Sequence, residues 1–375
     1  MAEKPLQTPD KIVKDSSLEV LVTNPEEVAV MTEDGGMIID FEEGAEFGTP
    51  SFDDNIAEFM ADDQLESLAS ELIQYFNADK QSRKDWEETY TKGLDQLGLK
   101  LEERTLPWQG ACGVFHPLLT ESVVRFQAES ITEIFPAKGP VDVRIVGDID
   151  QETQNQSVRV KDYLNYLLTE KMTEYRTETE KLLFNLPLAG SAFRKIYYDP
   201  TLNRPASMFV PAEDFVVSYG ASDLTTCDRA THIMKKSTND IKKLQVIGFY
   251  KDVNLQEPSE DLTNIESKYS ELTGEKQSYE NDNRHTILEM MVDLDLEGFE
   301  DRQGGQVTGI ALPYVVTLDY QSSKILAIRR NFIESDPLKK RRQHFVHYQY
   351  LPGMGFYGFG LIHLIGGIAK SATSL

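Results

Sequence analysis

The segment Pro107–Pro136 reads PWQGACGVFHPLLTESVVRFQAESITEIFP, and the rest of the chain is organised around it. Its first part, Trp108–Gly113, combines one large aromatic side chain with two glycines and a thiol, which is typical of a turn. From Pro117 to Phe135 the apolar residues recur at steps of three and four, which predicts a helix. Pro117 suits a first helical turn, and Pro136 ends the helix because the residue before a proline is driven out of the α region.

Two apolar tracks run along this predicted helix. They consist of Leu119, Val123, Phe126 and Ile134, and of Val124, Ala128, Ile131 and Phe135. A helix with two occupied tracks is expected to be covered on more than one side. We therefore interpret the segment as a core helix and take four of its residues as core or hinge positions: Trp108, Pro117, Phe135 and Pro136.

The composition describes an acidic protein that can form a substantial core. The chain has 375 residues, of which 40% are hydrophobic and 27% charged, enough for two or three compact units. Its net charge of −24 argues against a general nucleic-acid binder, which usually carries a basic face. It does not exclude a conduit for DNA, because an acidic wall lets a polyanion pass without binding it.

The cysteines and the apolar segments indicate the cellular compartment in which the protein is expected. Cys112 and Cys227 have no paired spacing, so we interpret them as reduced thiols in a cytosolic setting. The N-terminus is polar and acidic and has no signal-peptide pattern. The apolar stretch 358–372 is too short and too rich in glycine to span a bilayer, so we expect no membrane association.

The chain divides into five parts by composition and periodicity. Residues 1–62 are expected to form an acidic, disordered arm. Residues 63–251 are expected to be helix-rich, with one helix at 238–246, and 252–283 an acidic surface loop with one helical turn. Residues 284–352 are expected to be β-rich, with a hairpin that joins 309–320 to 324–332. Residues 353–375 contain a glycine–aromatic turn and the start of a helix. The predicted fold class is α+β: a helical pair and core helices followed by an antiparallel β-rich unit.

Three segments carry more specific expectations. A stripe of Leu65, Leu68, Ala69, Leu72, Ile73 and Phe76 predicts a one-sided helix from Asp63. Residues 141–146 are expected to form a strand. Residues 151–172 are expected to form a helix with Val160, Tyr163, Leu164 and Leu167 facing inward.

Four motifs in order resemble the portal proteins of tailed bacteriophages, in the branch found in short-tailed phages. The first is Trp108–Gly110 with Gly113–Pro117 and a helix ending in Ile134–Phe135–Pro136. The others are GSAFRKIYYD at 190–199, VPAEDF at 210–215 and GFYGFG at 355–360. The resemblance covers roughly residues 65–375, and its specificity lies in the order and spacing of the motifs.

The resemblance implies a structural protein of the virion, assembled in the host cytoplasm. Portal subunits form a ring, usually a dodecamer, at one capsid vertex; they contact capsid and scaffolding proteins, dock terminase and tail adaptors, and let double-stranded DNA through. They are not enzymes and need no cofactor. Portal chains of this branch are longer, with a stem and clip after this point. The apolar helix that reaches Leu375 therefore suggests the N-terminal wing part.

One motif supports an enzymatic alternative. Gly353, Gly355 and Gly358 match G-x-G-x-x-G between a strand and a helix, as in a dinucleotide site. The acid expected about 20 residues later has no counterpart here. We interpret Gly355 and Gly358 as hinge or core positions instead. A second alternative is an acidic interaction module of a cell.

The remaining polar candidates give no catalytic site. His344 and His347 are three apart and fall on opposite sides of a strand, which disfavours a shared metal. No nucleophile, metal or cofactor motif is found. Four successive cations, Lys339, Lys340, Arg341 and Arg342, could join Arg329 and Arg330 in a basic patch. We expect that patch to contact a neighbouring subunit; the alternatives are a plain solvated loop and, behind it, a contact with DNA.

Overall fold

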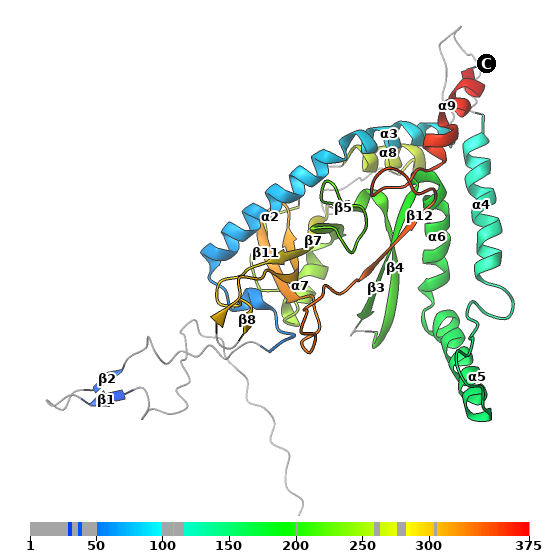
Figure 1. Ribbon diagram of the computed structural model, residues 1–375. Helices are drawn as coiled ribbons and strands as arrows, with labels where there is room; N and C mark the ends of the chain where they lie inside the picture. The colour runs from blue at the N-terminus through cyan, green and yellow to red at the C-terminus, as the bar shows by residue number, and fades with distance from the viewer. Residues whose placement is uncertain are drawn as a thin grey trace, which may run out of the picture. The chain divides into compact units, whose positions relative to one another are not determined.

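The computed structural model describes residues 29–31, 37–39, 51–99, 108, 116–199, 202–258, 263–275, 283–303 and 306–374 (Figure 1). The chain forms two compact units, Met1–Pro50 and Ser51–Leu375. In the first, strands β1 (Ala29–Met31) and β2 (Met37–Ile39) pair antiparallel. The second combines helices with antiparallel sheets, which confirms the predicted α+β class.

A five-stranded antiparallel sheet forms one half of the second unit. Its order is β11-β10-β7-β6-β5. The strands are β5 (Phe215–Val217), β6 (Arg229–Lys236), β7 (His285–Leu294), β10 (Leu312–Asp319) and β11 (Lys324–Arg330). The predicted hairpin between residues 309 and 332 is confirmed by the pairing of β10 with β11. A separate small hairpin joins β8 (Arg302–Gln303) to β9 (Gln306–Val307).

Helix α2 (Asp62–Ser82) lies across this sheet (Figure 1). Leu65, Ala69 and Leu72 recur at helical spacing and are buried with Phe76 against strand residues such as Val316. Apolar side chains at this spacing form one stripe, so burying them fixes which side of α2 faces the sheet. The predicted one-sided helix is confirmed.

The expected boundary of the acidic arm at residue 62 is wrong, because the chain joins the folded unit at Ser51. A short 3-10 turn, η1 (Ile56–Glu58), is buried beside β11. The side-chain amide of Asn55 donates to the Leu326 carbonyl (3.1 Å) and accepts from the Ile328 N–H (2.9 Å). Asn55 thus takes the place of a further strand at the outer edge of β11.

A three-stranded sheet forms the other half, in the order β12-β3-β4. Its strands are β3 (Ser191–Asp199), β4 (Arg204–Pro211) and β12 (Phe345–Gln349). One face packs on α6 (Glu174–Ala189) through Ala192 and Phe209. The opposite face contributes Phe193 to the main core. Strands of both sheets come from before and after residue 252, so the expected separation of a helix-rich 63–251 from a β-rich 284–352 is wrong.

Helix α4 (Leu118–Ile134) packs against α6 and α9 (Leu361–Ser374) at the edge of the unit (Figure 1). Leu119 and Val123 are buried, whereas Val124 and Ile134 are exposed. The expectation of a helix covered on more than one side is therefore wrong. The second apolar track is only partly covered, because α6 and α9 contact one side of α4.

Two further expectations fail near α5 (Gln151–Tyr166), which a π-helical turn, η3 (Leu167–Lys171), follows. Residues 141–146 form no strand; the Asn165 side chain instead holds the N–H and carbonyl of Val141 at 2.9 and 3.0 Å. Val160 and Tyr163 are exposed, and α5 buries no residue fully. Periodicity alone cannot indicate which side of a helix will find a partner.

The acidic segment 252–283 contains a ten-residue helix, α8 (Asn264–Thr273), rather than a single turn. Thr263 and Glu266 form a reciprocal capping box at its start. Ile265 is buried, and α8 packs against α3 (Lys84–Leu94). The segment is thus part of the body. Three short elements complete the unit: η2 (Asp95–Leu97), η4 (Ala212–Asp214) and the predicted helix α7 (Thr238–Val246).

Candidate functional site

Three of the four resemblance motifs meet at one buried junction. The backbone of Gly190 lies against that of Gly358, so a Cβ on Gly190 would stand 2.3 Å from the Gly358 carbonyl oxygen. A Cβ on Gly358 would stand 2.5 Å from the Gly190 oxygen. Gly190 also has φ +88, which favours glycine. The start of β3 and the glycine–aromatic loop therefore touch through their main chains.

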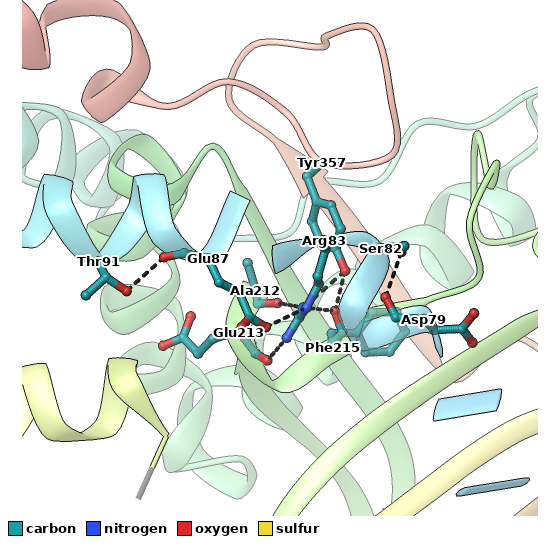
Figure 2. A network of polar contacts seen from close by, with 9 residues as sticks. All are labelled: Asp79, Ser82, Arg83, Glu87, Thr91, Ala212, Glu213, Phe215 and Tyr357. Carbon is teal, nitrogen blue, oxygen red and sulfur yellow. Dashed lines mark hydrogen bonds and ion pairs between the residues drawn. The ribbon is translucent and has the colours of Figure 1, made fainter. Parts of the chain in front are cut away.

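Arg83 connects this loop to the VPAEDF motif, as Figure 2 shows. It lies between α2 and α3 and is 6% exposed. Its Nη1 donates to the carbonyls of Ala212 (2.8 Å) and Phe215 (2.9 Å) and to Oη of Tyr357 (3.1 Å). Its Nη2 donates to the Glu213 carbonyl, and its Nε to Oε1 of Glu87 at 2.9 Å.

Aromatic rings surround this guanidinium group. Trp86 stacks between Tyr90 and Tyr357, with ring centroids 5.5 and 5.0 Å away. Tyr357 also donates its hydroxyl to the Phe215 carbonyl (2.8 Å). The group is thus satisfied by carbonyls, a carboxylate and ring faces together, which is how a buried charge becomes tolerable. The Arg83 side chain therefore acts as a structural pin.

Helix α8 joins the junction through a tyrosine chain. The Tyr269 hydroxyl donates to Oε1 of Glu213 at 2.6 Å and lies 2.9 Å from the Tyr90 hydroxyl. Burial raises the pKa of Glu213. Burial, and then the neighbouring Glu213 carboxylate, raises the pKa of Asp214 to about 7. The acidic segment 252–283 therefore contributes to the same polar network as Arg83.

His347 completes the junction on the β12 side. Its ring lies against those of Phe193 and Phe356, with centroids 4.5 Å from each, and the two phenylalanine rings are 5.9 Å apart. Its Nε2 lies 3.1 Å from Oγ of Ser191, which in turn accepts the Gly358 N–H at 2.8 Å. Burial lowers the pKa of His347 to about 4, so the ring is neutral at physiological pH. His344 contacts Asn331 instead, so the two histidines have separate partners.

Three amides at the end of the G-x-G-x-x-G stretch and just after it, those of residues 358–360, are engaged within the chain. Phe359 N–H donates to the Leu351 carbonyl at 2.8 Å, and Gly360 N–H donates to Nδ1 of His363 at 3.2 Å. With Gly358 bound to Ser191, three successive amides point at acceptors within the chain. A dinucleotide site needs such amides free for the pyrophosphate, and it follows a parallel strand. Both features disfavour nucleotide binding here.

The two candidate glycines differ in environment. Gly358 is enclosed by the Gly190 and Leu351 main chains, whereas a Cβ on Gly355 would meet nothing within 4 Å. Gly358 is therefore a core position and Gly355 is exposed. The other candidate core positions also differ from expectation. Trp108 is 67% exposed, and Pro117 and Pro136 are exposed beside the ends of α4. Phe135 is half-buried, with its ring 5.9 Å from that of Tyr175.

The four successive cations do not form one patch. Lys339 pairs with Asp301, and Arg341 donates to the Cys227 carbonyl and to Asp293 at 2.8 Å each. Arg329 and Arg330 bind the carbonyls of residues 51–53 and of Phe249. Lys340 and Arg342 remain exposed.

Sequence reasoning missed Arg83, Tyr269 and Asn55. The one available signal for Arg83 is its spacing to Trp86 and Tyr90, which places a cation and two aromatics on one face of a turn. Tyr269 was obscured by the acidic composition around it. Asn55 carries no signal, because its partners Leu326 and Ile328 lie far along the chain.

A comparison of the sequence with models of known protein families and with curated proteins found no match. Within the described ranges, no three His, Cys, Asp or Glu side chains come together as a metal site. Of the helices the structure describes, none is both long and apolar enough to cross a membrane.

Proposed function

We propose that this chain is a portal subunit, a structural component of a tailed-phage virion that forms a ring at one capsid vertex. In this role the ring takes in DNA during packaging and releases it at ejection. Its partners are further copies of the chain, the major capsid and scaffolding proteins, terminase, tail adaptors and the DNA in the channel. The subunit itself carries out no chemical reaction.

One observation carries the proposal. Three motifs that resemble portal proteins, at 190–199, 210–215 and 355–360, are far apart in the sequence and pack into one junction around Arg83 and Gly358. Residues brought together in this way serve a shared purpose. Their polar groups bind a carbonyl and a hydroxyl of the same chain, so that purpose is to fix the position of the loop before α9.

The exposed apolar side chains of the outer helices support assembly. Val124 on α4 and Leu364 and Ile368 on α9 are exposed. Large apolar residues gathered at the surface mark interaction sites more often than accidental exposure. Subunits of a ring bury such residues against the next copy.

Electron microscopy and mass photometry of the purified full-length protein test the proposal. We expect closed rings, dodecamers if the resemblance holds, at concentrations where capsid proteins assemble. Monomers under every assembly condition would contradict it. A gene for a large terminase or a capsid protein next to this one would support it and would weigh against a cellular interaction module.

The nucleotide-binding alternative has its own test. Calorimetry with mono- and dinucleotides should detect no binding, because the amides of residues 358–360, which lead into α9, are engaged within the chain. Tight binding that is lost in Gly355→Ala would favour the enzyme over the portal subunit.

A further inference from the structure

A second buried guanidinium group, that of Arg194 in β3, lacks the partners that Arg83 has. Arg194 is 4% exposed. Its Nη2 donates to Oγ1 of Thr179 at 2.7 Å, and its guanidinium carbon lies 4.7 Å from the ring centre of Tyr175. Its Nε is buried without a hydrogen-bond partner. Among the residues that the structure describes, its Nη1 has no hydrogen-bond partner, and unlike Nε it is not fully enclosed, so a partner could reach it.

Neighbouring cations differ from Arg194 because each has a carboxylate. Lys195 binds both oxygens of Glu289 at 2.7 and 2.5 Å. Arg204 forms a two-point pair with Glu174 at 2.7 and 2.9 Å. Across the residues that the structure describes, no carboxylate lies at ion-pair distance from Arg194. A buried cation without a counter-charge is costly, so this site is incomplete in the isolated chain.

Exposed apolar side chains lie beside Arg194 on the same sheet face. Ile196 and Tyr198 follow it at alternate positions of β3, and alternate residues share a face. On β12, Val346 is the direct cross-strand partner of Arg194, and Tyr348 is that of Ala192. All four are exposed, although Ala192 at the near end of this face packs under α6. We call Ile196, Tyr198, Val346 and Tyr348 the β3–β12 patch.

We propose that the β3–β12 patch docks a second copy of this chain, and that a carboxylate of that copy pairs with Arg194. The inference rests on the proposed function and names one of the contacts that build the ring. Interface energy concentrates in aromatic and arginine side chains on an apolar surface, and this patch places Tyr198 and Tyr348 on the same sheet face as the buried Arg194.

Charge complementarity identifies the occupant as a second copy. The chain carries 62 acidic and 38 basic side chains, for a net charge of −24, so two copies repel each other at long range. Close approach needs a place where a carboxylate is attracted. An uncompensated guanidinium group on an apolar face provides one, and every copy supplies carboxylates in excess.

Mass photometry over a dilution series tests the proposal on the full chain. We expect Arg194→Met to raise the concentration of half-assembly at least about tenfold, because removing one member of an interfacial charge pair weakens association strongly. The matched control is Arg176→Met. It removes the same charge from exposed Arg176 on α6, which pairs with Glu180 of its own chain, and should leave assembly unchanged.

A second pair of variants leaves Arg194 in place, so it tests the patch even if the Arg194→Met protein folds poorly. Ile196→Ser removes an exposed apolar side chain from the patch and should also weaken assembly. Ile247→Ser makes the same exchange at an exposed position elsewhere and should not. Thermal melting of each variant monitors folding.

The outcomes separate this inference from the proposed function. Rings formed equally well by folded Arg194→Met and Ile196→Ser would overturn the inference and leave the portal proposal standing. Open dimers, lost in both variants, would support the inference and contradict the portal ring. A wild-type chain that stays monomeric would overturn both. Binding of a short DNA duplex that depends on Arg194, with assembly unaffected, would identify nucleic acid as the occupant and overturn the inference.

Discussion

Arg83 and Arg194 are both buried in the same compact unit, yet their surroundings are opposite. Arg83 reaches four acceptors through Nη1 and Nη2 and a carboxylate through Nε, and it joins α2, η4 and the loop before α9. Arg194 reaches one hydroxyl and one ring face. Removal of a guanidinium group from water costs about the same in both places, so only the compensation differs.

The difference separates two roles for a buried charge. At the Arg83 junction the chain supplies every partner, and the charge fixes one internal arrangement. Beside the β3–β12 patch the chain supplies too few partners for Arg194, and in our proposal a second copy supplies the missing carboxylate. A change at the first site should therefore affect folding, and a change at the second should affect association.

The largest effect is expected from Arg83→Met. The variant removes the Arg83 donors from three main-chain carbonyls and the Glu87 carboxylate, and we expect it to lower the free energy of unfolding by about 3 kcal/mol or more. Arg83→Lys should be intermediate, because an ammonium cannot serve so many acceptors at once. Urea denaturation measures both. Lys84 is an exposed neighbour, so Lys84→Met is the control. If Arg83→Met were as stable as Lys84→Met, Arg83 would not hold the junction together.

The second-largest effect on stability is expected at the main-chain contact between Gly190 and Gly358. Gly190→Ala adds a Cβ against the Gly358 carbonyl at a positive φ, and we expect it to cost about 1–3 kcal/mol. The matched control, Gly355→Ala, adds its Cβ to open space and should change stability by less than about 0.5 kcal/mol. Equal melting temperatures for the two variants would show that the glycines do not hold the loop.

A pH series tests the Arg83 junction, because burial there raises the pKa of two acids, Glu213 and Asp214. Burial raises the pKa of Asp214 from 3.8 to about 7, so the folded state retains a proton that the unfolded state has lost. The contribution of Asp214 to the free energy of unfolding is therefore greatest below pH 4 and is lost as the pH rises to about 7. Asp214→Asn should remove that component, so denaturation at pH 5 and 8 should show a smaller fall than in wild type.

The control for this series is Asp223→Asn. Hydrogen bonds from Thr225 and Thr226 lower the pKa of Asp223 to about 2, so its contribution changes only at more acidic pH. The Asp223→Asn variant should follow wild type between pH 5 and 8. If Asp214→Asn does the same, then Asp214 does not retain its proton at the junction.

The smallest effect on stability is expected from Arg194→Met, in contrast to Arg83→Met. Methionine fills similar space without a charge to compensate, and replacement of a buried charge by an apolar side chain is often neutral or stabilising. We expect the unfolding free energy of the monomer to fall by no more than about 1 kcal/mol, measured at concentrations below assembly. A loss as large as that of Arg83→Met would show that Arg194 is an internal pin as well.

The sequence predicted the elements better than their partners. The stripe Leu65–Ala69–Leu72 on α2 and the β10–β11 hairpin follow from local spacing and were correct. The prediction that α4 is covered on more than one side was wrong. Two apolar tracks show that a helix can pack on two sides, but they do not show that neighbouring elements lie on both. The inward side of α5 was wrong for the same reason.

The candidate site was only partly predictable. Gly358 was recognised through its motif, but the reason for its glycine, contact with the Gly190 main chain, depends on two distant segments meeting. Arg83 lay outside every motif. The division at residue 252 failed because antiparallel strands pair across any sequence distance, and β6 lies beside β7 although 48 residues, 237–284, separate them.

The side chain of Asn55 has a practical consequence for work with shortened forms of this protein. A form that starts at Asp63, where composition alone would place the cut, loses Asn55 and leaves the Ile328 N–H and the Leu326 carbonyl open at the rim of a hydrophobic sheet. Such rims recruit strands from other molecules and promote aggregation. A form that starts at Ser51 keeps the rim sealed and should stay in solution.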